Sequence, residues 1–243
     1  VELRRMLRFK EPKDLNELVS RTREIAVSQA LSRASKWFSR KAVQGTNQGA
    51  DNVHSVYVKV LKHLVADQTV KKKHTTLDKL GLISRLDTVE KISKQLSEYE
   101  LATSLDVSDF KSVLSTDNEH AYLITSDLLS TYIESLESRL EAVSSIYYIL
   151  DKFVSIVNGL LTDKKIGFHL SNGFYIENMK KETLTTAQLS SGEQQLLLLF
   201  CYVIVARDQP SIFMIDEPEI SLNIKWQRKL VQTLLDITDG GNV

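Results

Sequence analysis

Cysteine, proline and glycine are scarce in this sequence, and each shortage excludes a class of structure. Cys201 is the only cysteine among 243 residues, so neither an internal disulfide framework nor a cysteine-based zinc site is expected. The five histidines form no close pair in the sequence, so no structural metal is predicted. Three prolines and nine glycines leave few chain breaks, which favours long helices.

Long hydrophobic runs are lacking as well. The most apolar run, residues 196–206, is about 11 residues long, whereas a membrane-spanning helix needs about 20. No signal peptide is visible at the N-terminus. We therefore expect a cytoplasmic protein that does not use a membrane as a partner.

Hydrophobic periodicity predicts four helical stretches in the first two thirds of the chain. Helices are expected at residues 14–42, 53–65 and 76–104, and the polar residues 45–51 are expected to be a loop or the scar of a missing segment. The strongest pattern spans residues 126–161, where apolar residues are separated by alternating steps of four and three. This heptad seam is typical of a projecting coiled-coil arm, although a buried helix of a compact bundle has the same spacing. The seam consists of Leu129, Ile133, Leu136, Leu140, Val143, Tyr147, Leu150, Val154, Val157 and Leu161.

The period changes near residue 163. Asn172-Gly173 between two apolar runs predicts a β-hairpin. An apolar helix is expected to end near Arg207, a buried strand is expected at 211–215, and a last helix at 224–236 with Trp226, Leu230, Leu234 and Leu235 on its buried side. We therefore predict a helical arm or insertion domain over residues 1–162 and part of an α/β head over residues 163–243.

Two motifs in this second part carry the chemistry. Leu189-Ser190-Ser191-Gly192-Glu193 precedes Ile212-Phe213-Met214-Ile215-Asp216-Glu217, and Asp216 lies 24 positions after Gly192. Ser190 is suited to cap a helix that starts near Gly192, with Glu193 in its first turn. The free N–H groups and the positive dipole end of that helix would attract a phosphate, and Gly192 would let it approach the backbone.

The two motifs together resemble those of the ABC ATPase superfamily. The resemblance implies a partial α/β ABC-ATPase head, its signature and Walker B half, with a large coiled-coil-like helical insertion. It also implies that Ser190, Ser191, Gly192 and Glu193 contact the ATP held by an opposite subunit, so that the heads work as a homodimer or higher homo-oligomer. Asp216 would hold Mg²⁺, and Glu217 would be the catalytic residue that polarises the attacking water.

The residues after Glu217 resemble a narrower group. Ser221 and Asn223 occupy the D-loop position, which in the superfamily crosses the dimer interface. The segment Asp216-Glu217-Pro218-Glu219-Ile220-Ser221-Leu222 is similar to the corresponding motif of the OLD-like and PtuA-like bacterial defence and repair ATPases. These ATPases are related to RecF and SMC heads. His often follows the Leu in that group, whereas this chain has Asn223. The resemblance implies an HNH nuclease partner, or a reverse transcriptase with its nucleic-acid product.

Several parts of an ABC head are absent from the sequence. No Gly-Lys pair occurs, so there is no Walker A phosphate loop, and neither the Q-loop nor the switch histidine is found. Because the chain begins at Val1 and ends where a new strand is expected, we interpret it as a fragment, or as a chain with further segments. A degenerate, non-catalytic coiled-coil interaction protein is the alternative, and a transporter subunit is disfavoured by the long helical part before the signature.

Charge is balanced overall but uneven. Lys and Arg equal Asp and Glu at 31 each, yet residues 1–44 contain eleven of the former against five of the latter. This basic stretch would suit the phosphate backbone of DNA or RNA, with Trp37 and Phe38 stacking on bases. It would equally suit a solvated helix face whose aromatic residues anchor the helix.

Overall fold

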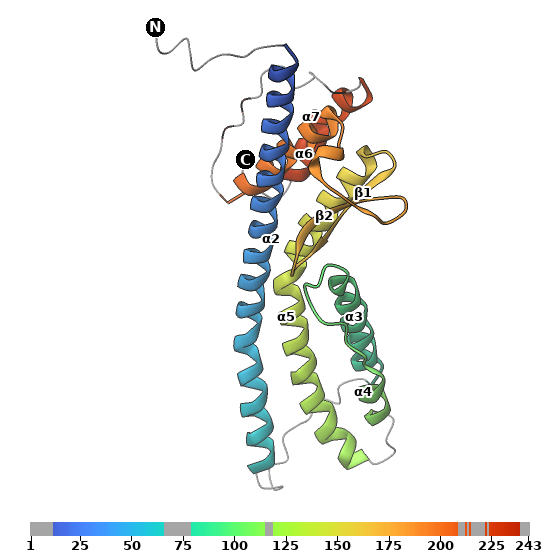
Figure 1. Cartoon of the computed structure of the whole chain (residues 1–243). Helices are drawn as coiled ribbons and strands as arrows, with labels where there is room; N and C mark the ends of the chain where they lie inside the picture. The colour runs from blue at the N-terminus through green and yellow to red at the C-terminus, as the bar shows by residue number, and fades with distance from the viewer. Residues whose placement is uncertain are drawn as a thin grey trace. The chain divides into compact units, whose positions relative to one another are not determined.

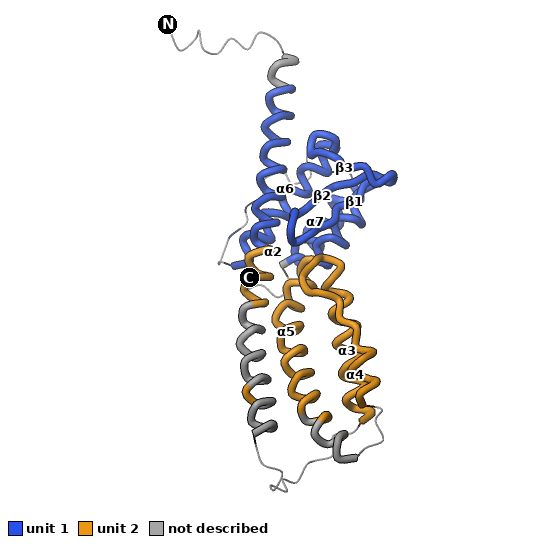
Figure 2. Tube along the Cα trace, turned by 60° about the horizontal axis from the view of Figure 1, so that its bottom comes forward, with its two compact units in different colours: residues 1–37, 151–243 blue, residues 38–150 orange. Residues whose placement is uncertain are grey.

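The computed structural model describes residues 12–65, 79–114, 119–208, 212, 214, 222 and 224–238 (Figure 1). Its chain divides into two compact units. Unit 1 contains residues 1–37 and 151–243, and unit 2 contains residues 38–150 (Figure 2). The contacts thus group the N-terminal residues with the α/β part, while the boundary proposed at residue 162 stays a prediction.

The first helix is longer than the sequence predicts. Helix α2 (Pro12–Val65) is continuous over 54 residues, so the helices expected at 14–42 and 53–65 are confirmed as parts of one element. The loop expected at 45–51 is wrong. Packing explains why two glycines do not break the helix there: a Cβ on Gly45 would stand 2.6 Å from the Ala142 carbonyl oxygen. Glycine therefore lets α2 lie close to a second helix, which offsets its weak helix propensity.

That second helix, α5 (Glu119–Leu160), contains the predicted heptad seam except for its last residue, Leu161. Most of the seam residues are buried, whereas Tyr147 and Leu161 are half-buried. Further side chains outside the seam are also buried on α5, among them Ile146 and Phe153. In unit 2 this helix contacts α2 through Ala142 and α3 through an ion pair of Glu137 with Arg85, with N–O distances of 2.9 and 2.6 Å. The projecting coiled-coil arm stays a prediction.

Helix α3 (Lys79–Ser97) ends earlier than the expected residue 104. Glu100 adopts a left-handed conformation with φ of 60°. The Leu101 N–H donates to the Leu96 carbonyl (3.0 Å) and the Glu100 N–H donates to the Ser97 carbonyl (3.1 Å). This is the hydrogen-bond pattern of a Schellman C-cap, here without the glycine that would have marked it in the sequence.

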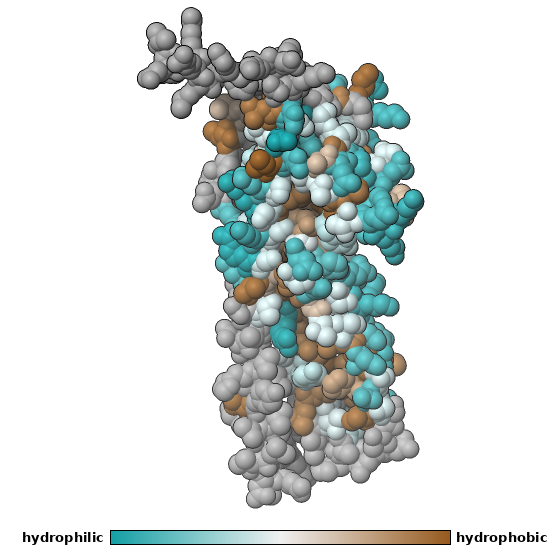
Figure 3. All heavy atoms as spheres, in the orientation of Figure 1, coloured by the Kyte–Doolittle hydropathy of each residue, from teal (hydrophilic) through white to brown (hydrophobic). Residues whose placement is uncertain are grey.

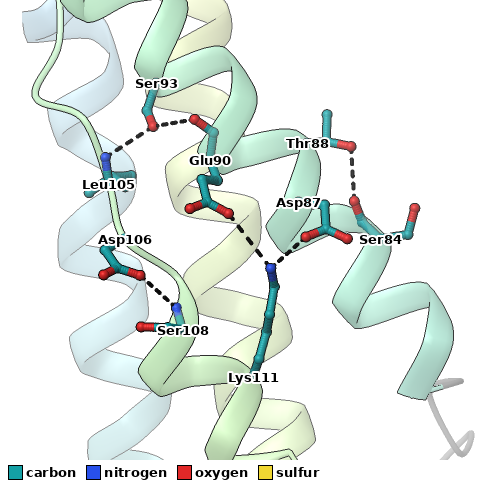
Figure 4. A network of polar contacts seen from close by, with 9 residues as sticks. All are labelled: Ser84, Asp87, Thr88, Glu90, Ser93, Leu105, Asp106, Ser108 and Lys111. Atoms are coloured by element: carbon teal, nitrogen blue, oxygen red, sulfur yellow. Dashed lines mark hydrogen bonds and ion pairs between the residues drawn. The ribbon is translucent and has the colours of Figure 1, made fainter.

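Polar contacts fix the segment after this cap against α3, as Figure 4 shows. The Ser93 hydroxyl accepts a hydrogen bond from the Leu105 N–H (3.1 Å). The short helix α4 (Ser108–Val113) carries Lys111, whose Nζ lies 2.5 Å from Asp87 and 3.6 Å from Glu90. The hydrogen bond with Asp87 is the main cause of a raised pKa of the Lys111 ammonium.

In unit 1 the buried stripe of α2 begins later than its periodicity indicates. Leu18, Val19 and Ile25 are about half exposed or more, whereas Val27 is fully buried. The stripe comprises Val27, Ala30, Leu31, Ala34 and Trp37. The Trp37 indole N–H donates to the Asp208 carboxylate (2.9 Å), so this buried side chain holds α2 to the end of the α6 segment within unit 1 and is not open for base stacking. In unit 2 Phe38 is likewise fully buried.

The expected hairpin is confirmed. Strands β1 (Lys164–His169) and β2 (Gly173–Asn178) pair antiparallel, and β3 (Thr183–Leu184) adds to β2, giving the sheet order β1-β2-β3. Gly173 has φ of +80°, a conformation that favours glycine. A Cβ there would also stand 2.7 Å from the Ser35 hydroxyl of α2. The neighbouring Phe174 N–H donates to that hydroxyl (3.0 Å).

Two helices complete the described part of unit 1. Helices α6 (Ser191–Ala206) and α7 (Ile224–Thr238) pack together, and the Arg207 guanidinium donates to the Ile237 carbonyl. On α7 the prediction holds for Leu230, which is buried, and fails for Leu235, which is 54% exposed.

The buried strand expected at 211–215 is not found at its two described positions. Ile212 and Met214 are 90% and 91% exposed and belong to no strand. A central parallel strand is buried only when neighbouring strands and helices cover it, and the sheet formed by the described residues consists of β1, β2 and β3.

The described residues are thus mostly helical with a small three-stranded antiparallel sheet. Hydrophobic and hydrophilic residues alternate in small patches over much of the face drawn in Figure 3. Among the helices that the structure describes, none has the length and apolar character needed to cross a membrane.

Candidate functional site

The start of helix α6 is the part of the predicted site that the structure describes. Ser190 is its N-cap, in an extended conformation with φ of −64° and ψ of 159°. The Ser190 Oγ accepts a hydrogen bond from the Glu193 N–H (3.3 Å), and the Glu193 carboxylate accepts one from the Ser190 N–H (2.7 Å). These reciprocal bonds form a capping box, which confirms the cap predicted from Ser190 and the place of Glu193 in the first turn.

At the start of α6, two of the backbone N–H groups donate to Ser190. The first four N–H groups of an α-helix have no partner within the helix. Here the Ser190 hydroxyl takes the Glu193 N–H, and the Gln194 N–H donates to the Ser190 carbonyl (2.9 Å). Ser191 and Gly192 are the two residues of the first turn that precede Glu193. Ser190 and Ser191 are exposed, whereas Gly192 is buried.

The segment before the cap is held by a side chain of α6 and by the backbone of α2. A 3₁₀ helix, η1 (Thr186–Gln188), leads into Ser190 and has its own capping box between Thr185 and Gln188. The buried Gln194 amide donates to the Thr186 carbonyl (2.8 Å). The Thr186 hydroxyl donates to the Glu24 carbonyl of α2 (3.4 Å). The turn that carries Ser190 is thus fixed from both sides, which keeps its exposed hydroxyl in place.

A buried ion pair lies beneath the same turn. Lys164 Nζ stands 2.9 Å from Glu193 Oε2 and 3.1 Å from Oε1, and the two side chains are 22% and 5% exposed. Sequence reasoning missed Lys164, because the two residues are 29 positions apart and no local pattern links a strand lysine to a helix cap. A buried carboxylate is stable only when paired and hydrogen-bonded, and Glu193 meets both conditions.

The remaining predicted site residues lie outside the described part of the chain. These are Asp216, Glu217, Ser221 and Asn223, so their distances from Ser190 stay predictions. Between them, Leu222 is buried and its carbonyl accepts a hydrogen bond from the Gln227 amide (3.0 Å). No group of three or more His, Cys, Asp and Glu side chains suited to a metal occurs among the residues that the structure describes.

The described end of α6 fits a phosphate group. It offers two exposed serines and the positive end of a helix dipole, and its one carboxylate is turned inward to Lys164. The Mg²⁺ ligand predicted for such a site, Asp216, is outside the described residues, and the binding of a phosphate at α6 stays a prediction.

Comparison with known proteins shows which family the chain belongs to. Residues 15–242 match the model of the AAA_21 family, described as AAA domain, putative AbiEii toxin, Type IV TA system. The match covers nearly the whole chain, including the helical part as well as the α6 segment. No curated protein matches the chain.

Proposed function

We propose a function from one premise: the chain belongs to the AAA_21 family of AAA-type ATPase domains and is therefore a nucleotide-binding ATPase domain. Within that family, it would be the signature-motif part of an ABC-type head that hydrolyses ATP between two subunits. The observation that carries the proposal is the start of α6, where a capped helix end with exposed hydroxyls occurs at the predicted signature residues. Its geometry suits the terminal phosphate of an ATP held by a second head.

The chemistry follows from the order of the two motifs. Phosphoryl transfer depends mainly on positioning and on compensation of negative charge. In the proposal Ser190, Ser191 and Gly192 bind the γ-phosphate from the opposite head. Glu193, which was also predicted to contact ATP, instead shapes their turn through its capping box with Ser190. Asp216 holds the Mg²⁺ that accompanies ATP. Glu217 polarises the attacking water, and Ser221 and Asn223 cross the interface. The active site would then be complete only in a homodimer or higher homo-oligomer.

The biological role is proposed from the resemblance to the OLD-like and PtuA-like ATPases. ATP-driven closure of two heads would regulate an HNH nuclease, or a reverse transcriptase with its nucleic-acid product, in anti-phage defence. A repair ATPase of the RecF or SMC kind is the alternative. Direct contact with DNA or RNA would use exposed cations of α2 such as Arg33 and Lys36. It would be a contact with phosphates, since Trp37 is buried.

ATP hydrolysis by the natural protein that contains this chain tests the proposal. The wild type is compared with Glu217→Gln, and the mass of the particles is recorded with and without ATP. Removing the carboxylate that polarises the water should lower kcat by roughly a hundredfold or more, while ATP remains bound and holds the heads together. Glu98→Gln, which neutralises an exposed carboxylate of unit 2, is the matched control and should keep wild-type turnover.

Two results would contradict the proposed function. A wild type that neither hydrolyses ATP nor changes mass with ATP would favour the non-catalytic interaction protein. Equal turnover in the wild type and Glu217→Gln would remove Glu217 from the catalytic role while leaving the ATPase activity in place.

A further inference from the structure

The ion pair beneath the α6 turn has a feature that helix capping alone does not require. A capping box needs an acceptor at the position of Glu193, and a neutral Gln serves as well as Glu. In this chain the acceptor is a carboxylate, and a lysine from a different element, β1, lies against both of its oxygens at 2.9 and 3.1 Å. The pair is largely buried, with the Glu193 side chain 5% exposed, so solvent screens it weakly.

The charge of Glu193 opposes the function proposed for this end of the helix. A carboxylate in the first turn is stabilised by the helix dipole. Its negative charge in turn reduces the positive potential that would otherwise attract a phosphate. A triphosphate approaching Ser190 and Ser191 would meet a like charge one turn away. Lys164 removes that conflict, because its ammonium cancels the carboxylate and holds it toward β1.

We propose that Lys164 is a positioning residue for ATP: by neutralising Glu193 and holding it inward, it keeps the exposed end of α6 able to accept a triphosphate anion. The proposal deepens the function above and rests on it. Lys164 itself does not touch the nucleotide. Its effect is carried by the charge and the orientation of Glu193, so the two residues should act with opposite sign when they are changed one at a time.

A series of variants separates this role from simple stabilisation. The Lys164–Glu193 pair is neutral in the wild type, carries −1 in Lys164→Met, +1 in Glu193→Gln and zero in the double variant. Glutamine keeps the hydrogen bond from the Ser190 N–H, so the cap is retained. Lys165→Met is the matched control, since it removes an exposed lysine next in the same strand and changes the net charge of the chain by the same amount.

The measurement is the rise in melting temperature with added inorganic tripolyphosphate, and then with ATP, at low salt. The midpoint concentration, at which tripolyphosphate or ATP gives half of the rise in melting temperature, should increase about three- to tenfold in Lys164→Met. This is the size expected for one charge near a helix end. The midpoint concentration should fall or stay equal in Glu193→Gln and return to within about twofold of wild type in the double variant. Lys165→Met should also stay within about twofold. Raising the salt should shrink the differences.

The outcomes separate this inference from the proposed ATPase function. If both single variants shift the midpoint in the same direction, or if neither shifts it, the pair only supports the fold and the inference is overturned. If tripolyphosphate stabilises none of the proteins, the end of α6 is not an anion site and the inference also fails. Midpoint concentrations that follow the charge of the Lys164–Glu193 pair, in a protein that does not hydrolyse ATP, would support the role of Lys164 and reject the catalytic proposal. Normal turnover with an unordered series would do the reverse.

Discussion

At the scale of single residues, burial decides the chemistry of the one cysteine. Cys201 lies on α6 with none of its surface exposed, and this burial raises the pKa of its thiol well above the usual range. A thiolate is the reactive form, and a raised pKa keeps the thiol protonated between pH 7 and 9. Iodoacetamide should therefore alkylate the folded chain roughly a hundredfold more slowly than the unfolded chain, because reaction requires opening of the fold.

Intact mass after timed alkylation, with and without urea, measures this protection. For an exposed thiol with an ordinary pKa, the rate rises as pH rises from 7 to 9. The folded chain should show the same rise at a rate roughly a hundredfold lower at each pH, because the thiol reacts from opened molecules in which the burial that raises its pKa is lost. Alkylation in buffer at the rate found in urea would contradict the burial of Cys201 and with it the packing of α6.

The candidate site could be predicted from the sequence where its bonds are local. Ser190 and Glu193 are three positions apart, and a Ser followed at that spacing by Glu is a recognised capping pattern, so the cap was expected and confirmed. Lys164 could not be predicted, because its contact with Glu193 depends on the path of the chain between β1 and α6. Trp37 was ambiguous for the same reason: its partner Asp208 is 171 positions away.

At the scale of elements, two helical glycines offer a matched test of why α2 is continuous. Gly45 in α2 and Gly159 in α5 are both helical, yet a Cβ on Gly45 would meet the Ala142 carbonyl oxygen at 2.6 Å, whereas a Cβ on Gly159 would meet nothing within 4 Å. Gly45→Ala should destabilise the chain by about 1–3 kcal/mol, since the helices must move apart. Gly159→Ala should be neutral or stabilise it by up to about 1 kcal/mol.

Urea unfolding followed by circular dichroism gives both free energies of unfolding under one condition. Because the same methyl group is added to a helix in each variant, the difference between them isolates the contact of α2 with α5. Equal effects of the two substitutions would mean that Gly45 does not lie against Ala142, and that helix propensity alone accounts for the changes.

Local signals account for the elements that were predicted correctly and for those that were not. The hairpin turn was marked by Asn172-Gly173, and the structure places Gly173 in the left-handed region. The end of α3 was missed because Glu100, rather than a glycine, adopts the left-handed C-cap conformation. The loop at 45–51 was wrongly inferred from composition, since packing against α5 outweighs the local preference of its glycines.

At the scale of the whole molecule, unit 1 is built from two segments of chain separated by the whole of unit 2. Among the described residues, hydrogen bonds join the early segment to the late one, for example from Thr186 to Glu24, from Phe174 to Ser35 and from Trp37 to Asp208. Such long-range contacts leave no periodic trace in a sequence. They also mean that the α6 segment depends on α2 for its stability.

This dependence predicts that a substitution in the core of one unit lowers the protection from hydrogen exchange mainly in that same unit. Trp37 in unit 1 is 3% exposed and Leu86 in unit 2 is fully buried. Trp37→Ala should cost about 3–5 kcal/mol and Leu86→Ala about 2–5 kcal/mol. Hydrogen exchange followed by mass spectrometry should show the loss of protection in Trp37→Ala mainly over β1, β2 and α6, and in Leu86→Ala mainly over α3. Each loss should be about tenfold or more, since 1.4 kcal/mol corresponds to a factor of ten.

The pattern of exchange, rather than its size, decides between local and global unfolding. Cooperative units open separately when the contacts within each exceed those that couple them. If Trp37→Ala exposes β1 and α6 while α3 stays protected, the α6 segment is stabilised by α2 as part of unit 1. A uniform loss over the described helices and strands in both variants would mean that the chain unfolds as one unit. In that case the division at residues 37/38 and 150/151 would describe contacts only and would have no counterpart in the energetics of the fold.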